Sequence, residues 1–165
     1  MADTAEPRAR PIRIAVCGAG LADAPLVAAA EAVGEEIARR GAVLVCGGLG
    51  GVMEAAARGA ARAGGLTIGV LPGAATTGAN AWIALPLPTG MGEGRNVLVV
   101  RFAEAVIAIG GEWGTLSEIA LARKIGVPVV LLAPTLAAGL DLPRADSPAA
   151  AVEQAVRQAV DARHV

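Results

Sequence analysis

Short runs of β-branched and aliphatic residues alternate along the chain with longer Ala-rich segments whose apolar positions recur at a helical spacing. Parallel strands joined by crossover helices produce this alternation, and runs without a polar face are typical of strands covered on both sides. The sequence therefore predicts an α/β fold, a Rossmann-like doubly wound parallel sheet of about six or seven strands with helices on both faces. We expect the strands at residues 12–18, 42–48, 66–72, 82–87, 105–111 and 128–133.

Capping and stop signals predict where the helices begin and end. Asp23 is placed to cap a first helix, which Gly41 terminates, and its apolar stripe is Leu26, Ala30, Val33 and Ile37. We expect further helices at residues 51–62 and 115–125. Ser147 and Pro148 open a last helix that is expected to bury Val152, Val156 and Val160.

The segment "GRNVLVVRFA", residues 94–103, fits two structures. Its Val-Leu-Val-Val core favours a strand by propensity, whereas a crossover connection at this point requires a helix. Periodicity does not decide between them. The Gly-, Pro- and Thr-rich segments at residues 72–80 and 133–146 are predicted as loops.

Length and charge limit the organisation and the partners. A chain of 165 residues with 55% hydrophobic content predicts a single domain over residues 12–165, preceded by a polar, disordered tail at 1–11. A formal net charge of -1 argues against nucleic acid as a partner. No apolar stretch reaches the roughly 20 residues needed to cross a bilayer, and no signal peptide precedes the domain, so no membrane partner and a cytoplasmic location are expected.

Three expected strands end in glycines that lead into a helix, at "CGAG", "CGGLGG" and "GGEWGT". In a doubly wound sheet these ends share one edge, where bare backbone and free N–H groups at helix starts suit a phosphate. Gly18, Gly47 and Gly48 are therefore candidate ligand-binding residues. The alternative is that these glycines only allow strands and helices to pack closely.

Known nucleotide and cofactor fingerprints do not fit the glycine turns. The G-x-G-x-x-G pattern that opens at Gly18 has Asp23 at its third glycine, which argues against NAD. The single lysine, Lys124, lies inside an expected helix, so neither a P-loop nor a pyridoxal Schiff base is supported. No resident cofactor is expected.

Two cysteines and two tryptophans are further candidates. Cys17 and Cys46 could act as soft metal ligands, but two thiols without a nearby His make a poor site. We therefore expect no metal and assign both thiols to packing. Trp82 and Trp113 are candidates for stacking on a ring or for a subunit contact, and core packing is an equal alternative for Trp82.

Thr115 and Glu118 also have a purely structural interpretation. Their spacing matches S/T-x-x-E, a capping box in which the two residues satisfy each other's backbone N–H groups at a helix start. Capping explains neither the two glycines before them nor a bulky Trp113 at the sheet edge. A functional Glu118 is therefore the second hypothesis.

Three segments together carry a family resemblance: "GGLGGVMEAAARGA", "PTGMGEGRNVLVVRFAEAVIAIGG" and "GGEWGTLSEIALARKIGVPVV". The chain resembles the Lonely Guy-like (LOG/SLOG) superfamily, over roughly Ile12 to Leu132. Within it the chain is similar to a bacterial branch labelled "lysine decarboxylase-like", which also resembles molybdenum cofactor carrier proteins. The position of Lys124 argues against the decarboxylase activity.

The resemblance implies the site residues. In the phosphoribohydrolases of that superfamily, P-G-G-x-G-T-x-x-E binds a nucleotide phosphate and supplies a catalytic Glu. This implies phosphate or ligand binding by Gly110, Gly111, Gly114 and Thr115 and catalysis by Glu118. The family's M-x-x-R-K implies a ligand contact at Met91 and a catalytic Arg95, although Asn96 replaces the Lys and Ile109 replaces the first Pro.

Three functions follow as alternatives. The first is a phosphoribohydrolase that cleaves the N-glycosidic bond of a nucleoside 5'-monophosphate, with Glu118 stabilising an oxocarbenium-like state. The second is a carrier or sensor of a phosphorylated ligand, such as molybdenum cofactor or a nucleotide, without turnover. The third is a structural or regulatory assembly. The resemblance also implies a homodimer or higher homo-oligomer.

Overall fold

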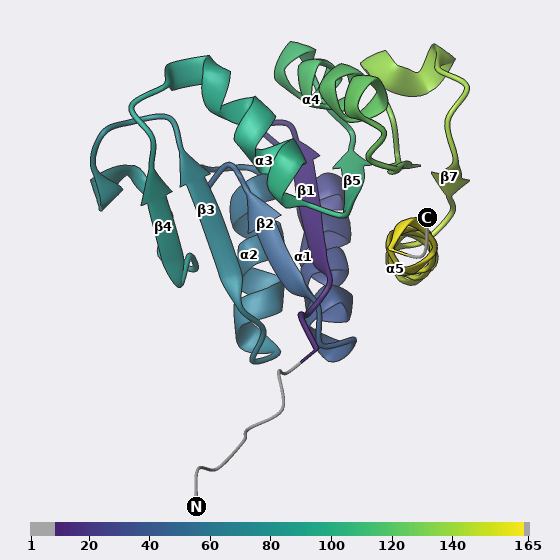
Figure 1. Ribbon diagram of the computed structural model, residues 1–165, viewed down its shortest axis with the longest axis horizontal. Coiled ribbons are helices and arrows are strands. Elements are labelled where there is room, and N and C mark those ends of the chain that lie inside the picture. The colour runs from purple at the N-terminus through teal and green to yellow at the C-terminus, as the bar shows by residue number, and fades with distance from the viewer. Residues whose placement is uncertain (1–8, 164–165) are drawn as a thin grey trace, which may run out of the picture.

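The computed structural model describes residues 9–163, and a seven-stranded parallel sheet forms its centre (Figure 1). The strand order is β4-β3-β2-β1-β5-β6-β7. The predicted Rossmann-like α/β class is thereby confirmed. The strands are β1 Arg13–Gly18, β2 Val43–Cys46, β3 Thr67–Leu71, β4 Leu85–Pro88, β5 Ala105–Ile109, β6 Val129–Leu132 and β7 Arg144–Ala145.

Helices cover both faces of the sheet, as Figure 1 shows. On one face α1, α2 and α5 pack against one set of alternate strand residues, and on the other α3 and α4 pack against the opposite set. The bounds are α1 Ala24–Arg39, α2 Val52–Arg62, α3 Asn96–Phe102, α4 Trp113–Ile125 and α5 Pro148–Ala162. Three short 3-10 turns, η1 to η3, lie at Thr76–Gly78, Gly92–Arg95 and Leu136–Gly139.

The segment at residues 94–103, which fits either a strand or a helix by sequence, is helical. Residues Gly92–Arg95 form η2 and continue directly into α3, so Val99 and Val100 pack against the sheet from a helix. The chain must travel from the edge strand β4 to β5 beside the central β1, across the face of the sheet. This crossover requirement overrides the β-propensity of the valines.

Three other local predictions need correction. β7 lies inside the predicted loop 133–146, where it pairs with β6. Helix α4 begins at Trp113 with Glu112 as N-cap and no side-chain cap, so Thr115 and Glu118 lie inside the helix and form no capping box. In α5 the buried residues are Ala151, Val152, Ala155 and Ala159, because the small alanines pack closest to the sheet while Val160 is exposed.

The cap and stop of α1 agree with the sequence. The Leu26 N–H donates to Asp23 Oδ1 at 3.0 Å, and Gly41 follows the helix with a φ of 69°. Of the predicted stripe, Ala30, Val33 and Ile37 are fully buried and Leu26 is half-buried.

Helices α1 and α2 cross at two glycines. A Cβ on Gly34 would lie 1.9 Å from the Ala56 carbonyl oxygen, and one on Gly59 would lie 1.9 Å from the Glu31 carbonyl oxygen. The two backbones therefore meet without side chains between them. The close crossing fixes both helices, and with them the two glycine turns that precede them.

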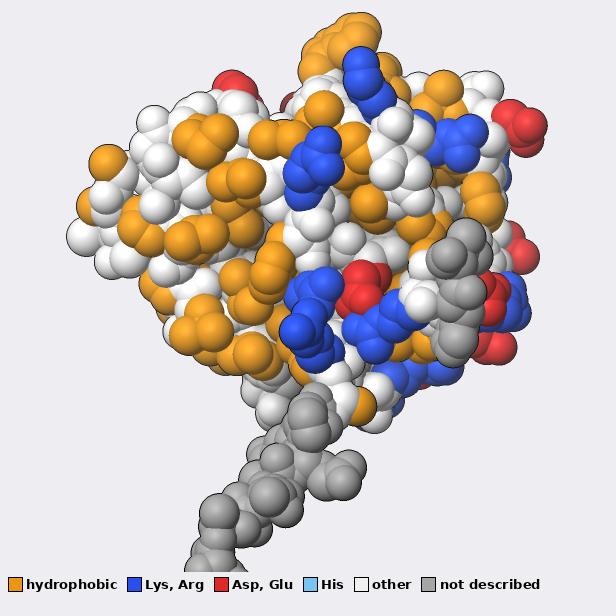
Figure 2. All heavy atoms as spheres, in the orientation of Figure 1, with side chains coloured by type: hydrophobic (Ala, Val, Ile, Leu, Met, Phe, Trp, Pro, Cys, Tyr) orange, Lys and Arg blue, Asp and Glu red, His pale blue; other side chains and the backbone are white. Residues whose placement is uncertain are grey.

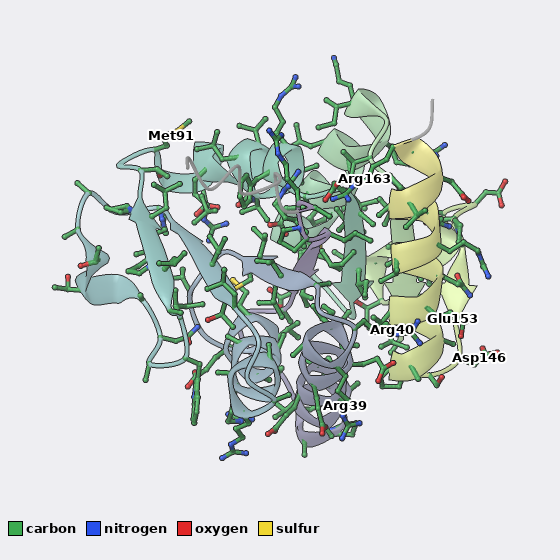
Figure 3. The ribbon with its side chains drawn as sticks, turned by 60° about the horizontal axis from the view of Figure 1, so that its bottom comes forward. Arg39, Arg40, Met91, Asp146, Glu153 and Arg163 are labelled. Carbon is green, nitrogen blue, oxygen red and sulfur yellow. The ribbon has the colours of Figure 1, made fainter. Side chains whose placement is uncertain are left out.

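At the amino ends of the strands, Glu104 connects Arg163, which follows α5, to Arg13 at the start of β1. Its carboxylate accepts from the Arg13 N–H at 3.0 Å and from Arg163 Nη2 at 2.9 Å, and Arg163 also donates to the carbonyl oxygens of Arg10 and Pro11. Figure 3 shows Arg163 at the end of α5. The predicted tail at 1–11 lies, except for residues 9–11, outside the described residues, which contain no helix long and apolar enough to cross a membrane.

Candidate functional site

The site lies at the carboxyl ends of the central strands, the upper edge of the sheet in Figure 1. Strand β1 is bonded to β2 on one side and to β5 on the other, so the connections from these strands run to opposite faces. Such a switch point leaves a crevice between diverging loops, which is where doubly wound proteins bind ligands. Here the crevice opens above Gly18.

A cavity of about 150 Å³ occupies this crevice. Its walls come from β1 and its turn, the start of α2, η2 and the start of α3, and the first turns of α4. The lining residues are Cys17, Gly18, Gly20, Met53, Glu93, Arg95, Asn96, Gly114, Thr115 and Glu118.

Arg95 is the cation of the cavity, and its side chain is buried, with the residue only 7% exposed. Nη2 donates to the Gly47 carbonyl oxygen at 3.3 Å, and Nη1 donates to Asn96 Oδ1. Nε has no hydrogen-bond partner, and no carboxylate of residues 9–163 forms an ion pair with the guanidinium. A buried cation without a bonded anion is costly, so the arrangement favours an anionic ligand.

The start of α4 supplies unpaired donors beside this cation. In the described chain the backbone N–H groups of Trp113, Gly114 and Thr115 find no acceptor, and Leu116 is the first residue to donate, to Glu112, at 2.9 Å. Two glycines with positive φ, Gly110 and Gly111, turn the chain from β5 into this helix. Free N–H groups and the helix dipole at this end attract an anion.

Glu118 lies at the base of the cavity and is also 7% exposed. Burial raises its pKa to about 7, and the neighbouring charge of Glu93 acts in the same direction. The charge of Arg95 and a hydrogen bond from the Cys17 thiol oppose this rise without cancelling it. At neutral pH a large fraction of Glu118 is therefore the neutral acid.

Both cysteines are buried and free. Burial raises the pKa of Cys17 well above its ordinary value, and the adjacent Glu118 raises it further; burial likewise raises the pKa of Cys46 to about 11. Both are thiols at neutral pH, so neither is a ready nucleophile or metal ligand. Within residues 9–163 no three His, Cys, Asp or Glu side chains gather as a metal site requires.

Five of the ten predicted site residues line the cavity: Arg95, Glu118, Gly18, Gly114 and Thr115. Gly47 lies directly behind it, because a Cβ there would stand 2.5 Å from Arg95 Nη2. The other four lie outside the lining. Gly48 donates to Cys46 Sγ and accepts from the Asn80 N–H, and Gly110 donates to Leu132.

The two remaining predicted residues, Gly111 and Met91, also lie outside the cavity lining. The Gly111 carbonyl accepts from the Thr135 hydroxyl, so this residue shapes the turn before α4. Met91 is 48% exposed, and Figure 3 shows its side chain at the outer margin of the molecule. Met53, at the start of α2, is the methionine that lines the cavity.

Sequence reasoning missed Gly20, Met53, Glu93 and Asn96 as site residues and assigned Cys17 to packing. Asn96 entered only as a departure from a Lys, although it lies next to Arg95 at a helix start. Its Oδ1 accepts from Arg95, and its Nδ2 donates to Ser117 Oγ at 3.3 Å, which joins α3 to α4. Adjacency to the glycine turns was the available signal for Gly20 and Met53.

The fold and the cavity define a class of protein: Rossmann-like α/β proteins with a glycine-lined cavity at the switch point of a parallel sheet. The model of the SLOG cluster4 family matches residues 11–160, and the chain belongs to that family. The predicted superfamily is thereby confirmed.

Solved structures agree over nearly the full length. The molybdenum cofactor binding protein of the phototrophic bacterium Rippkaea orientalis is 36% identical, with a TM-score of 0.81 over 94% of this chain and 99% of that one. The molybdenum cofactor carrier protein of Chlamydomonas reinhardtii is 34% identical, with a TM-score of 0.82 over 92% and 99%. A sequence relative, an uncharacterized protein of Archaeoglobus fulgidus, is 46% identical over 123 residues, which make up 74% of this chain and 81% of that protein.

Proposed function

We propose that this protein binds and carries a phosphorylated pterin cofactor of the molybdenum-cofactor type, and that it holds the phosphate in the Arg95 cavity without cleaving the ligand. The observation that carries the proposal is the buried Arg95 guanidinium, whose Nε lacks a partner and which forms no ion pair within residues 9–163. A phosphate supplies both the charge and the acceptor oxygens that are missing.

The size of the cavity determines which part of the ligand enters it. Pockets for whole drug-sized ligands measure roughly 300–1,000 Å³, whereas this one measures about 150 Å³. It therefore takes the phosphate end, and a ring system must lie on the rim. Two exposed apolar residues adjoin lining residues in the sequence: Leu21 follows Gly20 and is 89% exposed, and Trp113 precedes Gly114 and is 76% exposed. Both offer apolar surface to a flat ring.

Two features favour binding over turnover. Arg95 is held by Asn96, at the position where the hydrolase motif has Lys, and it makes no ion pair with Glu118. Glu118, with a pKa of about 7, carries only part of a negative charge at neutral pH, and an adjacent phosphate would reduce that charge further. A neutral acid stabilises an oxocarbenium-like state poorly. The two molybdenum cofactor proteins, similar over more than nine-tenths of this chain, support the same conclusion.

The test is the content of protein purified from a host supplied with molybdate. We expect molybdenum by elemental analysis, and pterin fluorescence after oxidative release, in a constant ratio. Arg95→Met should reduce both at least tenfold, whereas Arg157→Met, at an exposed position of α5, should leave them unchanged. Wild-type protein that holds neither component, and takes up neither from a molybdopterin donor, would contradict the proposal.

A second function is favoured by one observation. Glu93 lines the same cavity as Glu118, so two carboxyl groups flank the site as in many glycoside hydrolases. Cleavage of a nucleoside 5'-monophosphate therefore stays a candidate. Incubation with AMP separates the functions, because a hydrolase releases adenine whereas the proposed carrier at most binds AMP.

We further propose that the chain forms a homo-oligomer through the uncovered side of β3 and β4. Figure 2 shows apolar side chains over this part of the surface, and a groove of about 320 Å³ runs there between the strands and α3. Its lining is apolar except for Arg101, and β4 is an edge strand with Leu85 and Leu87 about half exposed. Light scattering should give more than one copy per particle, and Leu87→Asp should give monomers while Leu136→Asp does not.

A further inference from the structure

The charges that line the cavity do not suit a dianion if every group is ionised. Arg95 is positive, whereas Glu93 and Glu118 are acidic, and the other lining residues are uncharged. With both carboxyl groups ionised the lining would carry a net negative charge and would repel a phosphate. With Glu118 neutral, the charges of Arg95 and Glu93 cancel. The free N–H groups at the start of α4 then make the cavity attractive to an anion.

The surroundings of Glu118 favour the neutral form. The residue is 7% exposed and forms no ion pair with any described cation. The thiol of Cys17, on β1 beneath it, lies within hydrogen-bonding reach of the carboxyl group. A thiol is a weak donor, so it orients a carboxyl group without supplying the charge that would keep it ionised.

We propose that Glu118 binds the ligand as a neutral acid, donating a hydrogen bond to an anionic oxygen beside Arg95, and that Cys17 positions the carboxyl group for this role. The inference rests on the proposed phosphate site and adds to it the protonation state of the site. In the bound state the Glu118 carbonyl oxygen accepts from the Cys17 S–H. This leaves the acid O–H directed at the ligand.

The titratable and charged groups that act on Glu118 come from β1, β2 and η2. Cys17 on β1 and Cys46 on β2 are both buried thiols, and the charge of Glu118 raises the pKa of each. From η2, Glu93 opposes ionisation of Glu118 and Arg95 favours it. A bound dianion adds to the effect of Glu93, so binding takes up a proton wherever free Glu118 is ionised.

Sulfate is the probe, because it stays a dianion from about pH 5.5 to 8.5, whereas a phosphate ester titrates near pH 6. We expect sulfate affinity, measured by calorimetry, to be constant at low pH and to fall by up to about tenfold per pH unit above pH 7. Glu118→Gln has an amide donor and no titration, so it should bind as tightly as wild type at low pH and show no fall.

The outcomes separate the two proposals. Sulfate that does not bind wild type even at low pH would remove the anion site, and with it both proposals. If sulfate binds and Glu118→Gln loses affinity at every pH, the carboxylate is the binding form and the inference fails alone. The inference also fails alone if Glu118→Gln keeps the pH dependence of wild type.

Cys17 has its own readout. The pH midpoint of Glu118, followed by NMR of the side-chain carboxyl carbon, should rise in Cys17→Ala, because the thiol hydrogen bond lowers the pKa of Glu118. Cys17→Ser keeps a donor and should restore the midpoint. Unchanged midpoints in both variants would show that Cys17 only fills space and would overturn its assigned role.

Discussion

Arg95 Nη2 donates to the carbonyl oxygen of Gly47 at 3.3 Å, although the two residues lie 48 positions apart. Gly47 follows β2, and Arg95 ends η2 beside α3, so the bond joins the turn before α2 to the segment that enters the opposite face of the sheet. The lack of a side chain at Gly47 makes the contact possible. A Cβ there would also stand 2.7 Å from Met53 Sδ.

Gly47→Ala should therefore move Arg95 and weaken sulfate binding at least tenfold while the sheet stays intact. Gly50→Ala is the matched control in the same turn, because its Cβ would make only an ordinary contact at 3.7 Å, with the Gly20 carbonyl oxygen. Calorimetry and far-UV circular dichroism of both variants test the prediction. Equal affinities would mean that Arg95 does not bind the anion from its observed position.

The pKa of Glu118 predicts how stability depends on pH. It lies near 7 in the folded protein, above the ordinary value of 4.5, so the folded state keeps a proton that the unfolded chain releases between these values. The contribution of Glu118 to the free energy of unfolding should thus be highest below pH 4.5. It should fall between pH 4.5 and about pH 7 and level off above that range. The loss is at most a few kcal/mol, since each pH unit contributes about 1.4 kcal/mol.

Urea unfolding of wild type and Glu118→Gln from pH 5 to pH 8 measures this effect. The difference between their free energies of unfolding should change by about 1.4 kcal/mol or less per pH unit. Glu153→Gln, at an exposed position of α5, is the control and should follow wild type. Parallel curves for wild type and Glu118→Gln would show that Glu118 ionises normally.

Replacing Trp113 should weaken binding of the ring system without weakening binding of the phosphate. Because it is 76% exposed, Trp113→Ala should leave the free energy of unfolding within about 0.5 kcal/mol of wild type. It should leave sulfate affinity unchanged but lower molybdenum and pterin content severalfold. Leu136→Ala, at a 49% exposed apolar residue of η3, is the control for lost apolar surface. Equal loss of sulfate binding in Trp113→Ala would mean that it acts on the cavity itself.

The close crossing of α1 and α2 predicts a large effect on stability. Gly59→Ala would place a methyl group 1.9 Å from the Glu31 carbonyl oxygen, so the helices must separate, at a cost of about 3 kcal/mol or more. Gly139→Ala, where the new Cβ meets nothing within 4 Å, should change stability by less than about 1 kcal/mol. The midpoints of thermal unfolding compare the two.

The fold was predictable because strand runs and helix caps are local signals, as the positions of β1, β5 and the Asp23 cap illustrate. Where a local signal was weak, prediction failed. β7 has only two residues, and α3 contains a valine run that becomes helical because of the crossover it must make. The start of α4 was placed two residues late because Thr115 imitates a cap.

The site was predictable in its motifs but not in its contacts. The glycine turns and the positions of Arg95 and Glu118 follow from the sequence, and the cavity includes both side chains. Asn96 as a partner of Arg95, Cys17 as a partner of Glu118, and Met53 in place of Met91 depend on which side chains converge from separate elements. Spacing along the chain carries no information of that kind.

The bonds from Arg163 to Glu104 and to the carbonyl oxygens of Arg10 and Pro11 bring the two described ends of the chain together at the amino ends of the strands. The Arg95 cavity opens at the carboxyl ends of the strands, the opposite edge of the sheet. Coupling the protein to a sensor chip or resin near residues 9–11 or near Arg163 would therefore leave the mouth of the cavity facing free solution, accessible to any ligand added there.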